Sequence, residues 1–204
     1  MLDSKPSRNR PSVAELKIVI AGGFGVGKTT LVGAISEIPP LTTEEVLTAA
    51  SQDTDNLEGI GDKTTTTVAM DFGRITFDQP RPMVLFLFGT PGQERFWFIW
   101  DDLCLGAVGA VVLVDTRRLE KSFAAVTYFE ERDIPFVVAI NRFSGGYHYT
   151  DEEVRSALEL SPSVPYLTCD ARDRSSALTV IVTLVQHSLA NAASRSLTSH
   201  GAHT

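Results

Sequence analysis

The chain has 204 residues, a formal net charge of −7 and an isoelectric point near 5.1. This length suits one domain with a sizeable core, and the acidic balance argues against nucleic acid as the main partner. No run of about 18 uncharged apolar residues occurs, so we expect no transmembrane segment.

Apolar stretches and helical patterns alternate along the chain between two polar ends. We expect the ends, 1–13 and 191–204, to be disordered tails around one domain that spans 14–190. The expected strands lie at 16–21, 67–77, 83–88, 109–115, 135–141 and 165–169. The expected helices lie at 28–38, after Phe96, and at 122–132, 151–160 and 175–190.

This alternation predicts an α/β fold with a doubly wound, mostly parallel six-stranded sheet. The runs 83–88 and 110–114 are continuously apolar, which is typical of parallel strands covered on both faces. Only strands 67–77 and 83–88 are joined by a short turn, so we expect one antiparallel hairpin at an edge. The segment 39–66 is long, polar and acidic, and a connection of that kind is usually functional or disordered.

Residues 22–29 read GGFGVGKT and match the pattern G-x-x-x-x-G-K-[ST]. They follow the first expected strand and open the first expected helix. Small residues let several backbone N–H groups converge on a phosphate, while Lys28 supplies a counter-charge and Thr29 a hydroxyl for Mg²⁺. A glycine-rich turn without a ligand is the alternative, and the flanking strand and helix argue against it. We therefore expect the chain to bind a nucleoside di- or triphosphate.

Two further motifs separate the candidates among phosphate-loop proteins. Residues 89–96 read GTPGQERF after the third expected strand, and four threonines occupy 64–67 at the start of the second. In order and spacing these motifs resemble those of Ras-like small GTPases over residues 15–190. The chain is most similar to the bacterial Ras-like GTPases of actinobacterial conservon operons, which are related to gliding-motility polarity GTPases. The third motif of that group often lacks its aspartate, as at Gly89, and the resemblance implies a small G-domain of the P-loop NTPase fold.

The resemblance implies specific roles near the phosphates. Lys28 would neutralise the β- and γ-phosphates during catalysis, Gly92 would donate its N–H to the γ-phosphate, and Gln93 would orient the attacking water. Thr29 and Thr67 would bind Mg²⁺, although a threonine run before a strand can also reflect β-propensity. The remaining nucleotide contacts of the loop would be Gly23, Gly25, Val26, Gly27 and Thr30.

Two motifs near the base are less regular. Residues 141–144 read NRFS where the family has Asn-Lys-x-Asp, and residues 169–172 read CDAR at its fifth motif. The resemblance implies that Asn141 braces the phosphate loop, that Arg142 covers the base, and that the Ala171 N–H meets guanine O6. Ser144 would accept from guanine without charge and would select it less sharply than an aspartate. In the same reading, Asp170 and Arg172 would complete the nucleotide site. The alternative for 169–172 is a short polar loop without a ligand.

These motifs predict a signalling switch that binds GTP and GDP with Mg²⁺ and hydrolyses GTP slowly, under the control of a partner. The alternative is a nucleotide-dependent binding module with little hydrolysis. Gly89, Ser144 and Phe24 favour it, and the ring of Phe24 can crowd Gln93. A small-molecule or nucleotide kinase is a third class, but it needs an arginine-bearing lid and an acceptor site, and the motif at 90–94 has no purpose there.

The expected partner and location follow from the aromatic residues and the cysteines. The aromatic residues of 96–100 either pack beneath the following helix or form a partner surface. Related bacterial GTPases bind a dimeric Roadblock/LC7 protein through their switches, which makes this type of protein the expected partner. The two cysteines, Cys104 and Cys169, suit a reducing cytosol. We therefore expect a cytoplasmic protein, which partners could recruit to a membrane.

Overall fold

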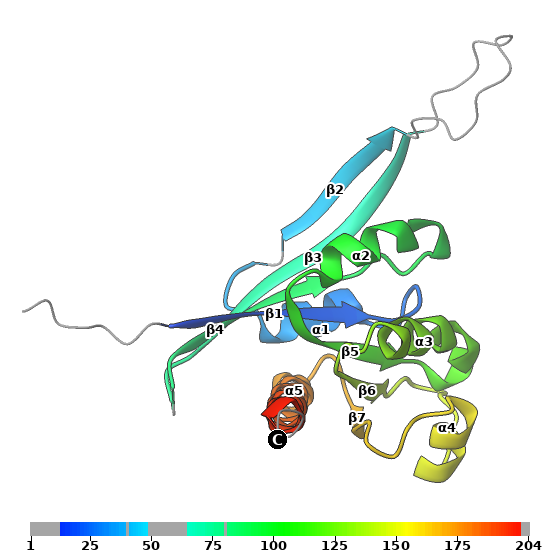
Figure 1. The fold of residues 1–204 in the computed structure, drawn as a ribbon. Coiled ribbons are helices and arrows are strands. Elements are labelled where there is room, and N and C mark those ends of the chain that lie inside the picture. The colour runs from blue at the N-terminus through cyan, green and yellow to red at the C-terminus, as the bar shows by residue number, and fades with distance from the viewer. Residues whose placement is uncertain (1–12, 40, 49–64, 80, 201–204) are drawn as a thin grey trace, which may run out of the picture.

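The computed structural model describes residues 13–39, 41–48, 65–79 and 81–200, and a seven-stranded sheet forms the centre of this part of the chain (Figure 1). The strands follow the order β2-β3-β4-β1-β5-β6-β7 across the sheet. Their bounds are Ala14–Ala21 (β1), Leu41–Thr48 (β2), Thr65–Phe77 (β3), Met83–Gly89 (β4), Ala107–Val114 (β5), Phe136–Asn141 (β6) and Tyr166–Cys169 (β7). The five strands from β4 to β7 in this order are parallel, while β3 and β2 pair antiparallel.

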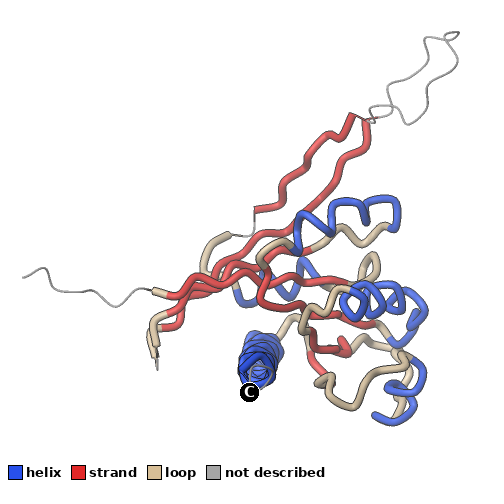
Figure 2. Tube along the Cα trace, in the orientation of Figure 1, coloured by secondary structure: helices blue, strands red, loops and turns tan. Residues whose placement is uncertain are grey.

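Helices cover both faces of the sheet (Figure 2). The α-helices are Lys28–Ile35 (α1), Trp100–Cys104 (α2), Phe123–Glu131 (α3), Asp151–Ala157 (α4) and Arg174–His200 (α5), and two 3₁₀ helices span Glu94–Ile99 (η1) and Thr116–Ser122 (η2). Alternate residues of a strand face opposite sides of the sheet. Ile18 and Ile20 of β1 therefore pack with α1 and α5, whereas Val19 and Ala21 pack with α2, α3 and α4.

The six expected strands are all present, and the α/β architecture with a mostly parallel sheet is confirmed. The expectation of six strands with one antiparallel hairpin is corrected by β2, which forms a second antiparallel pair with β3 inside the segment predicted as a connection. Glu44 and Glu45 break the apolar alternation of this strand. An edge strand satisfies its backbone with one neighbour and tolerates charges, so a hydrophobic pattern is not required. The remainder of the 39–66 segment, at 49–64, lies outside the described residues.

The carboxyl-terminal helix differs from the sequence-based expectation in length. We expected a helix at 175–190 and a tail without regular structure from 191, but α5 continues to His200. Alanine has the highest helix propensity, and Arg195 anchors this end because its guanidinium donates to the Asp133 carbonyl oxygen at 2.9 Å. Of the expected tails, residues 1–12 and 201–204 lie outside the described residues.

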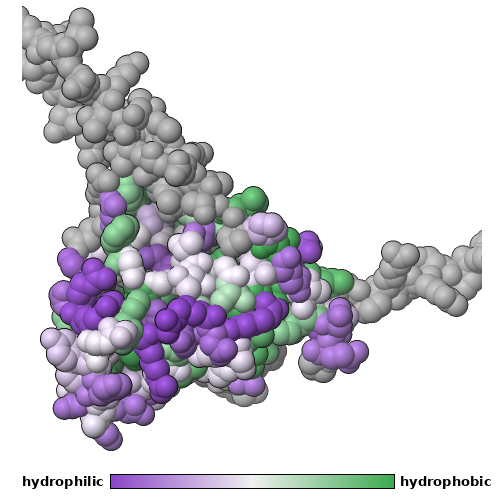
Figure 3. All heavy atoms as spheres, turned by 180° about the vertical axis from the view of Figure 1, so that it is seen from behind, coloured by the Kyte–Doolittle hydropathy of each residue, from purple (hydrophilic) through white to green (hydrophobic). Residues whose placement is uncertain are grey.

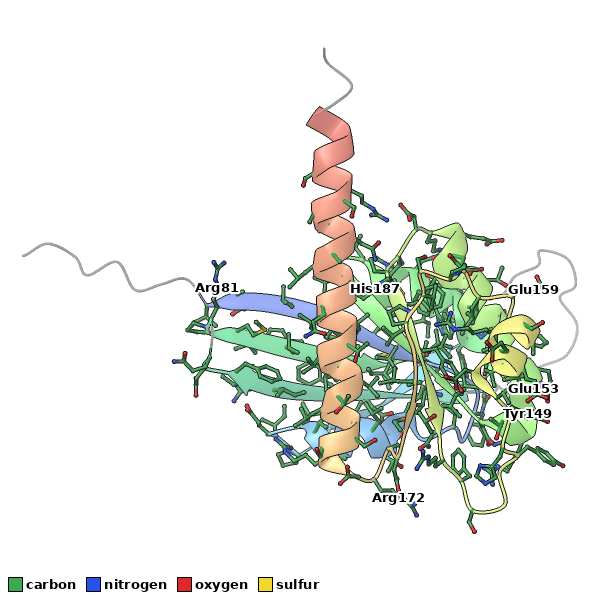
Figure 4. The ribbon with its side chains drawn as sticks, turned by 90° about the horizontal axis from the view of Figure 1, so that it is seen from below. Arg81, Tyr149, Glu153, Glu159, Arg172 and His187 are labelled. Atoms are coloured by element: carbon green, nitrogen blue, oxygen red, sulfur yellow. The ribbon has the colours of Figure 1, made fainter. Side chains whose placement is uncertain are left out.

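Helix α5 also bears on the prediction about membranes. Residues Arg174–Ser196 are long enough and apolar enough to cross one, by length and composition. The apolar residues Ala177, Val180, Ile181 and Leu184 of this helix are fully buried against the sheet, which α5 crosses (Figure 4). Core packing accounts for these four residues, whereas Val182 and Leu189 of the same helix are exposed; a single helix of this kind does not establish a membrane span.

Candidate functional site

The carboxyl ends of the parallel strands bring five loops to one edge of the sheet. These loops follow β1, β4, β5, β6 and β7. Open α/β sheets bind their ligands at this edge, close to the point where the strand order reverses. The sequence-predicted residues of the loops after β1, β4, β6 and β7 therefore lie at the same end of the molecule.

The loop between β1 and α1 has the backbone that its glycines permit. Gly22, Gly25 and Gly27 have φ values of +136°, +74° and +103°, a region that side chains disfavour. A Cβ on Gly27 would lie 2.6 Å from Nδ2 of Asn141, so the glycine also lets Asn141, at the end of β6, come close to the loop. The predicted phosphate loop thus connects a buried strand to a helix, as the motif requires.

Lys28 lies at the start of α1 with 8% of its surface exposed. Its Nζ donates to the carbonyl oxygens of Gly22 at 2.8 Å and Gly23 at 2.9 Å. Burial lowers the pKa of Lys28 to about 8, and the nearby Asp71 carboxylate opposes this shift. An ammonium has three N–H donors, so the third is left for a phosphate oxygen.

Asp71 on β3 is a site residue that sequence reasoning missed. The Thr29 hydroxyl donates to Oδ2 of Asp71 at 2.7 Å, and Asp71 is 7% exposed. Asp71 lies opposite Gly89 of β4, and a Cβ on Gly89 would lie 2.9 Å from the same oxygen. The Asp71 carboxylate therefore fills the space beside the position where the third motif usually carries its aspartate. The available signal was an aspartate between the apolar residues Met70 and Phe72 of an expected strand.

Thr67 is the other predicted metal ligand. It belongs to β3, where its backbone pairs with Val46, and its side chain lies outside the described set. Four residues separate Thr67 from Asp71, which is roughly 13 Å along a strand. The structure thus brings Asp71 to the hydroxyl of Thr29, and metal binding by Thr67 stays a prediction.

The loop after β4 packs on the phosphate loop. A Cβ on Gly92 would lie 2.7 Å from Nζ of Lys28 and 2.8 Å from the backbone nitrogen of Phe24. Only a glycine fits there, so this loop can come close to Phe24 and Lys28. Gln93 is exposed and precedes η1, and the Phe24 ring is 69% exposed.

Asn141 at the end of β6 connects two of the predicted loops. Its Nδ2 donates to the carbonyl oxygen of Val26 at 2.9 Å, and its Oδ1 accepts from the backbone N–H of Ala171 at 3.0 Å. The phosphate loop is therefore braced by Asn141, the contact that the resemblance implies. The Ala171 N–H, expected at a guanine oxygen, already has a partner within the protein.

A cavity of about 670 Å³ opens beside these loops. Its lining includes Asn141, Arg142, Ser144, Tyr149, Asp170 and Arg172. Arg172 donates to both carboxylate oxygens of Asp170, and these hydrogen bonds lower the pKa of Asp170 to about 2. Arg172 and Tyr149, which both line this cavity, are labelled in Figure 4, and Figure 3 shows hydrophilic residues gathered at the end that carries α4. The base end is therefore roomy and open to solvent, and its lining also includes apolar side chains such as Phe143 and Val154.

The aromatic residues after Gln93 divide into buried and exposed members. Phe96 and Trp100 are 6% and 2% exposed, whereas Trp97 and Phe98 are 37% and 65% exposed. Trp100 stacks on Phe129 of α3 with ring centroids 6.0 Å apart. Packing thus accounts for Phe96 and Trp100, while a partner surface at Trp97 and Phe98 stays a prediction.

Comparison with known proteins bears on the identity of this site. A family model described as "Conserved hypothetical ATP binding protein" matches residues 20–191. The chain belongs to this family. It is also 29% identical over 141 residues to the uncharacterized protein MJ1339 of Methanocaldococcus jannaschii, covering 68% of this chain and 77% of that relative. The family assignment and the loop geometry together identify a nucleotide-binding P-loop protein.

Proposed function

We propose that the protein is a molecular switch that binds GTP and GDP with Mg²⁺ and hydrolyses GTP slowly. The observation that carries this proposal is the convergence of Lys28, the Thr29–Asp71 pair and Gly92 at one end of the phosphate loop. These groups come from α1, β3 and the loop after β4. A γ-phosphate that contacted all of them would tie three separate elements together, as a switch requires.

The donor set near Thr29 suits a magnesium ion. A hydroxyl and a carboxylate offer the oxygen ligands that Mg²⁺ prefers, and Thr29 and Asp71 already lie within hydrogen-bond distance. A bound Mg²⁺ would supply additional positive charge at the phosphate oxygens. Lys28 would neutralise the same oxygens, the Gly92 N–H would hold the γ-phosphate, and Gln93 would orient the attacking water.

Guanine is the base that the resemblance favours, and adenine is the competing candidate because the family's description names ATP. Ser144 is exposed and uncharged, and the Ala171 N–H is engaged by Asn141. Both features weaken the contacts by which guanine would be selected. We therefore propose a modest preference for guanine nucleotides over adenine nucleotides.

A partner surface follows from the exposed aromatic residues. Trp97, Phe98 and Phe123 are exposed, and a groove of about 450 Å³ lies between η1 and α3. Aromatic residues are enriched at the centres of interfaces. We propose that a Roadblock/LC7-type protein binds here and regulates hydrolysis, and that the protein acts in the cytoplasm.

The alternative function is a nucleotide-dependent binding module that hardly hydrolyses. It is favoured by Phe24, whose bulky ring stands on the phosphate loop where Gly92 approaches it. A ring at this position can keep Gln93 from the attacking water. The two functions share the binding site and differ only in turnover.

Single-turnover hydrolysis of GTP, with ATP in parallel, separates these functions. The variant Gln93→Ala is compared with Gln79→Ala, which removes the same group from the exposed turn after β3. We expect slow phosphate release that falls in Gln93→Ala and is unchanged in Gln79→Ala. Absence of release from wild type, with and without a Roadblock partner, would establish the binding module instead.

A further inference from the structure

A buried aspartate and two arginines directly follow β5 at the same edge of the sheet. Asp115 is 4% exposed and caps η2, where its Oδ1 accepts from the backbone N–H of Arg117 at 3.0 Å. The Arg117 guanidinium donates to both Asp115 oxygens, through Nε at 2.9 Å and Nη2 at 2.8 Å. The function proposed above gives this group no role.

The two arginines are held differently. The Arg117 guanidinium lies over the ring of Phe143 at 4.0 Å from its centroid, in addition to its two bonds to Asp115. Nη2 of Arg118 lies 3.5 Å from Oδ2 of Asp115, and the Arg118 side chain is 48% exposed. Arg117 is therefore fixed in place, whereas Arg118 is more loosely attached and can turn to another acceptor.

Arg118 lies beside the phosphate loop. A Cβ built on Gly25 would be 3.5 Å from Nη2 of Arg118. Gly25 belongs to the part of the loop whose backbone N–H groups cradle the α- and β-phosphates. The backbone of Arg118 interrupts η2 at φ −147° and ψ 54°. The end of β5 thus presents a guanidinium next to the expected phosphates.

Charge adds a second reason for a cation at this position. The chain carries a net charge of −7, so its overall field repels an anionic ligand. Affinity for a nucleotide must therefore come from cations close to the phosphates. A guanidinium suits this task because its planar donors match two phosphate oxygens.

We propose that Arg118 is a phosphate ligand that turns from Asp115 to bond the α- or β-phosphate of the bound nucleotide. Arg117 keeps the Asp115 charge satisfied when Arg118 turns toward the phosphate. Di- and triphosphates share these phosphates, so Arg118 raises the affinity for both by the same factor and does not distinguish the two switch states. This inference rests on the nucleotide site of the proposed function.

Binding measurements on four proteins test the role of Arg118. Wild type, Arg118→Gln, Arg118→Lys and Arg81→Gln are titrated with the di- and triphosphate of the base that wild type prefers. Arg81 is a matched control because it is exposed at the turn before β4, far from the site (Figure 4). We expect Arg118→Gln to weaken both ligands about tenfold, Arg118→Lys to weaken both less, and Arg81→Gln to bind as wild type does.

Two outcomes would overturn the inference alone. One is wild-type affinity of Arg118→Gln for both ligands, and the other is a loss confined to the triphosphate, which would place the contact on the γ-phosphate. Wild type that binds no nucleotide would overturn the proposed function, and the inference with it. Thermal unfolding of each variant reports its folding, and Arg118→Lys keeps the test valid if Arg118→Gln does not fold.

Discussion

The two ends of the candidate site are built differently. At the phosphate end, Lys28 and Asp71 are 8% and 7% exposed, and Thr29 and Lys28 donate hydrogen bonds of 2.7 to 2.9 Å. At the base end, a cavity of about 670 Å³ is lined by the exposed Ser144 and by Asp170 and Arg172, which are hydrogen-bonded to each other. Buried, preorganised groups contribute more to binding than exposed ones, because they lose less entropy and compete less with water. We infer that the phosphates supply most of the affinity and the base supplies little.

The largest expected effect comes from removing the lysine of the phosphate end. Lys28→Ala deletes a charge-assisted contact worth about 1.5–3 kcal/mol, so nucleotide affinity should fall roughly 10- to 100-fold in calorimetry. Lys17→Ala is the matched control, because Lys17 lies in the first half of β1 and donates to Leu105. Equal affinity of Lys28→Ala and wild type would disprove the phosphate-loop assignment.

The depressed pKa of Lys28 predicts a pH dependence. Burial lowers this pKa to about 8, so the ammonium is mostly protonated at pH 7.5 and mostly neutral at pH 9. Affinity should therefore fall roughly tenfold over this interval, because only the protonated form neutralises a phosphate. Lys28→Ala should bind weakly at both values, and a wild-type affinity that is flat with pH would argue against a titrating Lys28.

The lowered pKa of Lys28 affects the stability of the fold in the opposite direction to nucleotide affinity. Lysine in the unfolded chain titrates near 10.4, so between about pH 8 and 10.4 the unfolded state binds more protons than the folded state. The contribution of Lys28 to the free energy of unfolding therefore rises with pH in this window. Chemical unfolding of wild type and Lys28→Ala at pH 7.5 and 9.5 measures the difference.

Asp71 provides a smaller effect that depends on magnesium. Asp71→Asn keeps an acceptor for Thr29 but removes the charge, so affinity for the diphosphate should fall roughly five- to tenfold with Mg²⁺. No loss is expected in EDTA. Asp78→Asn, on the exposed turn after β3, is the control. An equal loss with and without Mg²⁺ would show that Asp71 only supports Thr29.

The smallest effect is expected at the base end. Ser144→Asp supplies the carboxylate that accepts from guanine, and it should tighten GDP several-fold, up to about tenfold, without tightening ADP. Competition binding with GDP and ADP measures both. Tighter ADP, or no change in GDP, would show that position 144 does not contact the base.

The sequence predicts most of the fold and of the phosphate end, for physical reasons. The strand at 83–88 is continuously apolar and the phosphate loop has a fixed spacing, so both are local signals. Strand β2 carries Glu44 and Glu45 at the edge of the sheet and depends on its pairing with β3. Asp71 reaches the site because the pairing of β3 with β4 places it opposite Gly89. Such long-range pairings leave no periodic signal in the sequence.

The most direct test of the account is the affinity of wild type for GDP, GMP and ADP, measured by calorimetry with Mg²⁺. Because the phosphate end dominates, GMP should bind at least tenfold more weakly than GDP, while ADP should bind within about tenfold of GDP. Equal affinities for GMP and GDP, or strong binding of GDP with no detectable binding of ADP, would contradict the claim that the phosphates and not the base supply the affinity.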